Sequence, residues 1–405
     1  MKKNISITGI VIIALTFIMV CCSRNERIIS YKLTPDSVIT KLSDSIYLSD
    51  QVLCLDYAQN HLYVSDYNNG IYSIDCNGNN VNHLVKKGRG HGEVGACGHF
   101  YAKVDGEICL YDESEKSFNF YRNDKLLKMI KVDQGFVLSD ATRFFSIGDS
   151  VFHSITHNEN TMIIIGPEQS SKLGRFVDGL DDIRKPVISE RHVLKTENSI
   201  LLVGLGLPIV EEYDYNGKKI CSLNLMDIPR LKATYEKTQS NDPKSYFVVV
   251  EDAYYNHQKL YLLTSSNEND TYNCNTLYVI AKKNGKFEIE CSYKLSGKVY
   301  SAICITKDNK CFAFNSIDTS LEFYTLPTKQ EIIRLLNYKF NECEGIDNIN
   351  LDSLVDYATG LSQAEIVKVC NDAIKTSILN DIPIKQNEII KLFDEQHEIY
   401  PYKEA

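Results

Sequence analysis

The strongest constraint on the fold is a repeat, because one pattern recurs six times between residues 47 and 326. Each copy has a polar turn, a short apolar strand, a polar gap and a second strand with aromatic side chains. The short apolar strands begin at Leu62, Ile108, Val151, Ile200, Leu260 and Cys311. Repeats of about 40–50 residues with four short strands each are typical of β-propeller blades, which bury their faces by stacking around an axis. We therefore predict an all-β, six-bladed β-propeller over residues 47–326.

The first repeat shows the pattern most clearly. His61–Asp66 and Ile71–Asp75 alternate apolar and polar residues and flank Asn69-Gly70, a strong hairpin-turn signal. The composition agrees, since the 25 Tyr and 16 Phe residues favour strands. Ring closure often needs a strand from the far end of the chain. Within the N-terminal segment 22–46, Arg27 to Leu33 is the candidate for such a strand, and we expect it beside the last blade.

The N-terminus has the features of an export signal. Lys2 and Lys3 give a basic start, and residues 9–20 are almost purely apolar but short for a membrane span. With Cys21-Cys22 after it, this start resembles a bacterial lipoprotein signal, which is cut before a cysteine that then carries the lipid. The resemblance implies a signal peptide over residues 1–21 and a lipid on Cys22, with Cys21 as the alternative. It places the protein in the cell envelope, lipid-anchored at the outer membrane or the periplasmic face. A plain signal anchor is the other interpretation.

Thirteen cysteines in an exported chain raise the question of disulfides. Cys54, Cys109, Cys304 and Cys311 sit inside apolar, strand-like runs, and the sequence has no C-x-x-C pair that would indicate a zinc ribbon or a redox site. We expect these cysteines to be buried as small apolar side chains. One or two bridges among the thirteen remain open.

A glycine-rich loop follows the strands of the first blade. Its sequence, Gly88-Arg89-Gly90-His91-Gly92-Glu93, resembles the G-x-G-x-G-E signature of six-bladed, TolB-like or NHL-like propeller lipoproteins of Bacteroidetes, although typical members have Pro where His91 stands. The resemblance covers about residues 22–326 and implies a fold and a cellular place more than a reaction. Since glycines permit close backbone approach, Arg89, His91 and Glu93 are candidate ligand-binding residues. A tight turn between blades is the alternative.

Motifs for catalysis or metal binding find little support. Asp75 to Asn80 is similar to the start of a calcium loop, but Asn80 and Lys86 occupy the positions of the required Gly and Glu, so a hairpin turn is expected. His153 with His157, and Cys97 with His99, are too weakly placed to predict a ligand set. No G-x-S-x-G elbow is present. We therefore predict no catalytic residue, no metal and no cofactor.

Residues 327–405 change to helical spacing. Thr328 to Glu331 is a capping box for a first helix, and Asn350 is a candidate cap for a second. Ser362 to Glu365 is another capping box, followed by an apolar face with Ile366, Val369, Ala373 and Ile374. Pro383 ends that helix, and Ile389, Ile390 and Phe393 mark a fourth. We predict a small C-terminal α-helical domain after the propeller.

This tail resembles the four-helix lid of AAA ATPases. The matching phrases are Leu326 to Lys329 with Glu331, Leu351 to Leu361, and Ser362 to Ile366, where Gln363 replaces the family's Gly. The ATPase core is missing, since no G-x-x-x-x-G-K-[S/T] occurs in the chain. We therefore expect no ATP hydrolysis and interpret the chain as a propeller fused to a lid fragment.

Charge and fold together favour binding over catalysis. The net charge is −9, with 44 Lys and Arg against 53 Asp and Glu, so no basic excess points to nucleic acid. The leading hypothesis is a lipid-anchored module that binds a protein or glycan ligand on one face of the ring, where loops from six blades converge. The alternative is a propeller hydrolase or lyase acting on an extracytoplasmic polymer. A cytosolic ATPase accessory rests on the tail alone and conflicts with Cys22.

Overall fold

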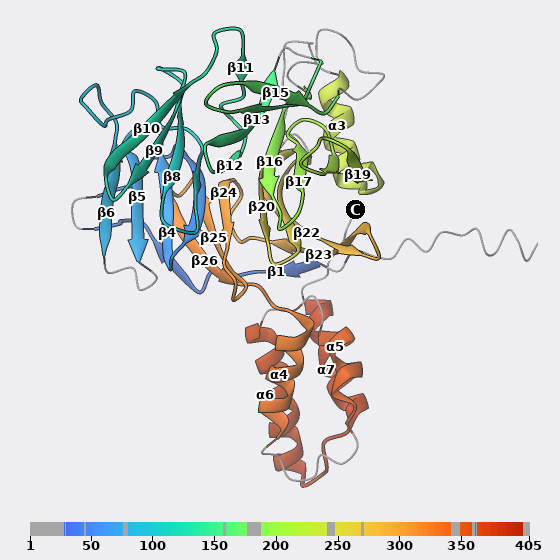
Figure 1. Cartoon of the computed structure of the whole chain (residues 1–405). Coiled ribbons are helices and arrows are strands. Elements are labelled where there is room, and N and C mark those ends of the chain that lie inside the picture. Colours follow the sequence, from blue (N-terminus) through green and yellow to red (C-terminus); the bar gives the residue numbers. More distant parts are fainter. Residues whose placement is uncertain are drawn as a thin grey trace, which may run out of the picture.

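The structure is a computed structural model, and it describes residues 28, 30–43, 46–75, 80–156, 159–175, 188–240, 248–268, 271–341, 349–358, 361 and 363–399. The predicted signal peptide with Cys21 and Cys22 lies outside the described residues. Figure 1 shows a ring of small sheets with a bundle of helices beside it. Within the described ranges, no helix has the length and apolar character needed to span a bilayer.

Six small sheets follow one another along the chain and form the blades (Figure 1). Blade 1 consists of β3 (Val52–Ala58), β4 (His61–Asp66), β5 (Gly70–Asp75) and β6 (Val81–Lys86). Blade 2 consists of β7 (Phe100–Ala102), β8 (Ile108–Asp112), β9 (Ser117–Arg122) and β10 (Lys125–Lys131). Blade 3 consists of β11 (Val137–Leu138), β12 (Phe145–Ile147), β13 (Ser150–Thr156), β14 (Met162–Ile165) and β15 (Ser170–Leu173).

The second half of the ring has the same plan. Blade 4 consists of β16 (Arg191–Lys195), β17 (Ile200–Gly204), β18 (Ile209–Tyr213) and β19 (Lys219–Asn224). Blade 5 consists of β20 (Val250–Asn256), β21 (Lys259–Glu268), β22 (Thr271–Lys283), β23 (Lys286–Lys294) and β1 (Ser30–Lys32). Blade 6 consists of β24 (Tyr300–Ile305), β25 (Lys310–Asn315), β26 (Ser320–Thr325) and β2 (Ser37–Ile39).

The innermost strands meet around the axis and close the ring. Each of β3, β7, β12, β16, β20 and β24 contacts the innermost strand of the next blade, and β24 of blade 6 contacts β3 of blade 1. The predicted six-bladed β-propeller is confirmed. Because all six innermost strands begin on the same face, the segments that lead into them gather there around the axis.

The closing strands differ from the prediction in one respect. Arg27 to Leu33 was expected beside the last blade, but Ser30–Lys32 runs parallel to β23 of blade 5 instead. Burial explains this position, because Tyr31 is 3% exposed and packs against Tyr293 with 5.3 Å between ring centroids. The strand that joins the last blade comes a few residues later, where β2 pairs with β26 in antiparallel register.

One helix, inserted in the chain between two blades, has no counterpart in the sequence prediction. A 3₁₀ turn, η1 (Leu225–Asp227), leads into α3 (Pro229–Ser240) between blades 4 and 5, and α3 packs on β21. Leu231 is fully buried there. The insertion explains why the repeats at Ile200 and Leu260 lie unusually far apart.

The four predicted C-terminal helices are present as α4 (Lys329–Phe340), α5 (Leu351–Ala358), α6 (Gln363–Asn380) and α7 (Gln386–Ile399). Thr328 and Glu331 form the expected capping box at α4. The Asn350 Oδ1 atom accepts from the Ser353 N–H at 3.2 Å at the start of α5. Ser362 of the second predicted capping box lies outside the described residues. The structure therefore confirms a small helical segment after the ring.

The cysteines of the predicted strands are present as thiols. Nine of the thirteen are described, and Cys54, Cys109, Cys304 and Cys311 are buried as expected. Burial raises the pKa of the Cys54 thiol to about 12, which keeps it protonated and unreactive at neutral pH.

Candidate functional site

The glycine-rich loop folds around its own glutamate. The Glu93 carboxylate accepts the Gly90 N–H at 2.7 Å, and the loop closes through Gly88 N–H to Val94 O at 2.9 Å. A Cβ atom at Gly88 would lie 2.0 Å from Glu93 Oε2, so the glycine leaves room for the carboxylate. Arg89 and His91 are exposed. This geometry favours the tight-turn interpretation, because the Glu93 carboxylate is bonded within the loop itself.

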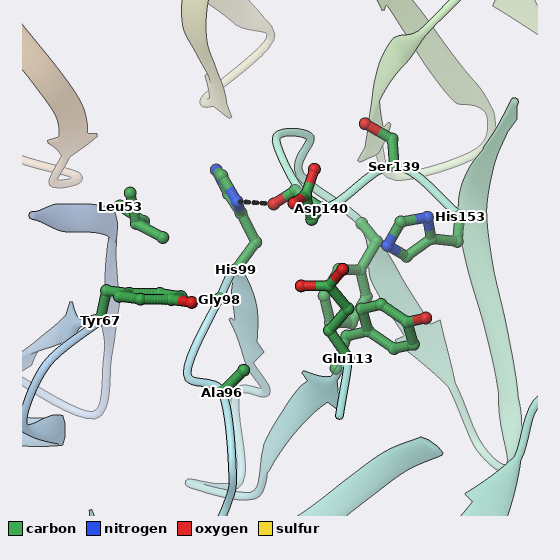
Figure 2. Close-up of a pocket in the computed structure, with 11 residues that line it drawn as sticks. Leu53, Tyr67, Ala96, Gly98, His99, Glu113, Ser139, Asp140 and His153 are labelled. Carbon is green, nitrogen blue, oxygen red and sulfur yellow. Dashed lines mark hydrogen bonds between the residues drawn. The ribbon is translucent and has the colours of Figure 1, made fainter. Parts of the chain in front are cut away.

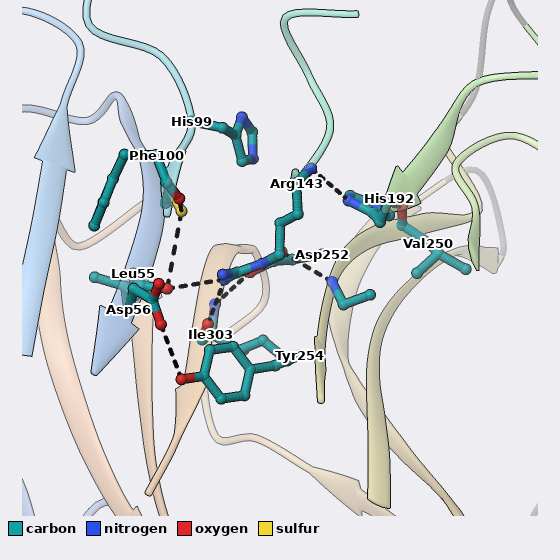
Figure 3. A network of polar contacts seen from close by, with 12 residues as sticks. Leu55, Asp56, His99, Phe100, Arg143, His192, Val250, Asp252, Tyr254 and Ile303 are labelled. Atoms are coloured by element: carbon teal, nitrogen blue, oxygen red, sulfur yellow. Dashed lines mark hydrogen bonds and ion pairs between the residues drawn. The ribbon is translucent and has the colours of Figure 1, made fainter. Parts of the chain in front are cut away.

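A buried ion pair occupies the centre of the ring (Figure 3). Arg143, from the segment that leads into β12, donates from Nε to Asp252 Oδ1 at 2.5 Å and from Nη2 to Asp252 Oδ2 at 2.7 Å. The same Nη2 atom reaches the Leu55 and Ile303 carbonyl oxygens at 3.0 and 2.7 Å. One side chain of blade 3 therefore ties blades 1, 5 and 6 together.

Further buried polar groups surround this pair. The His192 Nδ1 atom accepts the Arg143 N–H at 3.2 Å, which adds blade 4 to the network. Asp56 accepts the Ala102 N–H at 2.8 Å and the Tyr254 hydroxyl at 3.0 Å, which links blades 1, 2 and 5. Burial raises the pKa of Asp56 and lowers that of His192 to about 4. These buried polar groups form hydrogen bonds with one another, so the role of the ring centre is to hold the blades together.

A small cavity opens on the face where the innermost strands begin (Figure 2). Its volume is about 40 Å³. Blades 1 to 3 and the segments between them supply its lining: Leu53, Tyr67, Ala96, Gly98, His99, Tyr111, Glu113, Ser139, Asp140, Phe144 and His153. His99 also lies beside the central network in Figure 3. The cavity therefore adjoins the polar network at the centre of the ring.

Two histidines of this cavity are buried and neutral. His99 is 7% exposed and His153 is 1% exposed, and burial lowers the pKa of each to about 4. The Nδ1 atom of His99 bonds to the Asp140 carbonyl oxygen at 3.1 Å, and that of His153 bonds to the Ser154 carbonyl oxygen at 2.8 Å. Because a carbonyl oxygen only accepts, each Nδ1 carries the proton and each Nε2 keeps a lone pair.

Carboxylates border the cavity and continue toward blade 4. Glu113 and Asp140 are exposed at its rim. The Ser139 hydroxyl in the lining donates to Glu190 Oε2 at 2.7 Å. Burial, with the nearby Asp140 charge adding to it, raises the pKa of Glu190 to about 7. Within the described ranges, no group of three or more His, Cys, Asp or Glu side chains is placed to hold a metal ion.

The sequence pairs His153 with His157 and His99 with Cys97, and it does not indicate that His99 and His153 lie at one cavity. The signal that identifies this region is positional. His99 and Phe144 directly precede the innermost strands β7 and β12, and such positions meet on one face of a propeller. Glu113 follows the second strand of blade 2, whose turn lies on the same face.

Comparison with known proteins adds structural similarity only. No family model matches the chain, and no curated protein matches it. Among solved structures, it is similar to a member of the DUF4221 family from Bacteroides vulgatus, with 11% identity, a TM-score of 0.47, and 72% of this chain and 97% of that one covered. A candidate exported protein from Bacteroides fragilis has 14% identity, a TM-score of 0.45 and coverage of 81% and 95%. A streptogramin B lyase has 9% identity, a TM-score of 0.43 and coverage of 72% and 98%. The propeller architecture itself rests on the strand pairing of this chain.

Proposed function

We propose that this chain is a lipid-anchored protein of the cell envelope that binds a protein partner at the mouth of its propeller. The observation that carries the proposal is the cavity beside His99, which is open on one face while the Arg143 network fills the ring centre behind it. A cavity that is closed at the back can bind a group that projects from another molecule, but that group cannot pass through the ring. The N-terminal sequence up to Cys22 supports the anchor.

A protein fits this face better than a glycan or a drug-sized molecule. Small-molecule sites usually enclose about 300–1,000 Å³, and the cavity holds about 40 Å³. Such a space accepts one side chain from a partner whose remaining contacts lie on the loops around it. Affinity would then come from the wider surface, and the cavity would select the inserted side chain.

Catalysis at the same cavity is the second candidate. Two histidines and two carboxylates line one space, and side chains of both kinds serve as general acids and bases in enzymes. Binding ranks first because imidazoles with a pKa of about 4 are weak bases near pH 7.

Two experiments test the proposal. For the anchor, labelling with a fatty acid should be lost in Cys22→Ala. Labelling that survives replacement of both Cys21 and Cys22 would contradict lipidation.

For the partner, a photo-crosslinking phenylalanine analogue replaces Tyr67 in the lining, and in a matched control it replaces Tyr338, which is 72% exposed on α4. Crosslinked protein adducts in cells should form from position 67 and be absent from position 338. The absence of adducts at position 67, or equal adducts at both positions, would refute a partner at this face.

A further inference from the structure

The cavity lining offers hydrogen-bond acceptors. The Nε2 atoms of His99 and His153 carry lone pairs, because the Nδ1 atom of each ring donates to a carbonyl oxygen. Figure 2 shows the His153 ring directed into the cavity, on the side opposite Tyr67. The Ser139 hydroxyl donates its hydrogen to Glu190, so toward the cavity its oxygen can only accept a hydrogen bond. A lone pair that faces a small cavity can accept a hydrogen bond from a donor of another molecule.

Carboxylates at the rim of the cavity supply negative charge. Glu113 and Asp140 are exposed at the opening, while Tyr111 and Phe144 are buried in the wall at 8% and 3% exposure. Carboxylates and aromatic faces both attract cations. Lys87 already illustrates this preference, because its Nζ atom lies 4.3 Å from the centroid of the Tyr67 ring. The lining therefore suits a group that is positive and donates hydrogen bonds.

Size narrows the choice of cation. A cavity of about 40 Å³ has room for a few water molecules. The tetrahedral end of a primary amine, an ammonium with its last methylene, has this scale and carries three N–H donors for the acceptors of the lining. A planar guanidinium is larger and is best bound by a bidentate carboxylate in its plane. The buried residues of the lining offer no such carboxylate.

We propose that the cavity binds a primary ammonium group, namely the end of a lysine side chain on the protein partner. This inference rests on the proposed function for its source, since a free amine carries the same chemistry. An ammonium hydrogen points to the Nε2 lone pair of His153, and the carboxylates of Glu113 and Asp140 remain at the rim. The methylene stem passes between the aromatic walls.

The test is a titration of the processed chain from residue 22, labelled with ¹⁵N at histidine, by NMR. Nα-acetyl-lysine N-methylamide should shift the Nε2 resonances of His99 and His153 with millimolar affinity. The Nε-acetylated form, which is neutral, should leave both resonances in place. No shift with the charged probe, or equal shifts with both probes, would overturn the proposal.

Variants separate the rim from general charge effects. Glu113→Gln combined with Asp140→Asn should weaken the lysine probe about tenfold. Glu115→Gln is the matched control, because Glu115 lies in the same turn but pairs with Lys131 at 3.0 Å outside the cavity, and it should bind as the wild type does. Equally weakened binding of the lysine probe in the rim variant and in the control would mean that net charge alone causes the effect. That result would refute the site.

The outcomes distinguish this inference from the proposed function. Crosslinking at position 67 with no response to the lysine probe leaves the protein partner standing and refutes the ammonium. A response to the probe without crosslinking refutes the protein partner. A diamine such as cadaverine that binds more tightly than the lysine probe would then assign the site to a free amine and overturn the lysine source.

Discussion

Arg143 and Asp252 lie 109 positions apart in the chain and form a doubly hydrogen-bonded ion pair at the centre of the ring. Their side chains are 5% and 0% exposed. Asp252 also accepts the Ile303 and Ala253 N–H groups at 2.8 and 2.9 Å, so its carboxylate is held from three sides. The ion pair and these hydrogen bonds fix the positions of blades 3, 5 and 6 relative to each other.

Arg143→Met should lower the free energy of unfolding by about 3–5 kcal/mol, because it leaves the Asp252 carboxylate buried without its counter-charge. Urea unfolding measures the loss. Lys131→Met is the control, since its ion pair with Glu115 is exposed and should leave the midpoint nearly unchanged. Replacing both partners, as Arg143→Met with Asp252→Leu, should recover part of the stability. A loss below about 1 kcal/mol in the single variant would show that the pair does not hold the ring together.

Gly88 and Glu93 should behave as a coupled pair. Gly88→Ala places a methyl group where the Glu93 carboxylate lies, so the carboxylate must leave its bond to the Gly90 N–H. We expect a loss of about 1–2 kcal/mol in the free energy of unfolding. In a Glu93→Ala background the same change should cost much less, which a double-mutant cycle in urea measures. Additive losses would contradict this role for the glutamate.

Arg89→Ala and His91→Ala supply the comparison for that loop. Both side chains are exposed, so neither change should shift the unfolding midpoint. Loss of partner crosslinking at position 67 in either variant, with stability unchanged, would support them as ligand-binding residues.

The ring could be predicted because its cause is periodic. Alternating strands and turn residues such as Asn69-Gly70 recur along the chain, and Gly70 has the positive φ of 120° that such a turn requires. The capping box at Thr328 is equally local. Arg143 could not be predicted, because its partners Leu55, Asp252 and Ile303 come from distant blades and no short motif marks them. For the same reason His99 and His153 looked unrelated, although the fold places both at one cavity.

Glu190→Gln should change stability in a pH-dependent way. The pKa of Glu190 is about 7 in the folded chain against an ordinary 4.5, so the folded state holds this proton more tightly than the unfolded state. The resulting stabilisation is complete below pH 4.5 and is lost as the pH rises through 7. Glutamine keeps an acceptor for Ser139 and carries no charge. The variant should therefore exceed the wild type by up to about 3 kcal/mol at pH 8 and match it near pH 4.5. Thermal unfolding at both values tests this, and a difference of the same size at both would contradict it.

The helical tail should contribute little to the stability of the ring. Helices α4 to α7 pack chiefly on one another, α4 against α5 and α6, and α7 against α5 and α6. Ile332 and Leu336 of α4 nevertheless belong to the same apolar cluster as Leu326 at the end of the last blade. The Tyr293 hydroxyl donates to Pro327 O at 2.9 Å, and a chain that ends at Thr328 keeps this bond. Ring closure by β2 and β26 does not involve the helices.

Truncation after Thr328 should therefore leave the thermal midpoint of residues 22–328 within about 4 °C of the full chain, which corresponds to about 1 kcal/mol for a domain of this size. A chain that ends at Thr319 is the matched control, because it also loses β26 and leaves β2 without its partner, and it should lose cooperative unfolding. The isolated tail should be marginal, since about 75 residues bury little core. A fall of more than about 10 °C on truncation after Thr328 would mean that the apolar cluster around Leu326 makes the helices an integral part of the propeller.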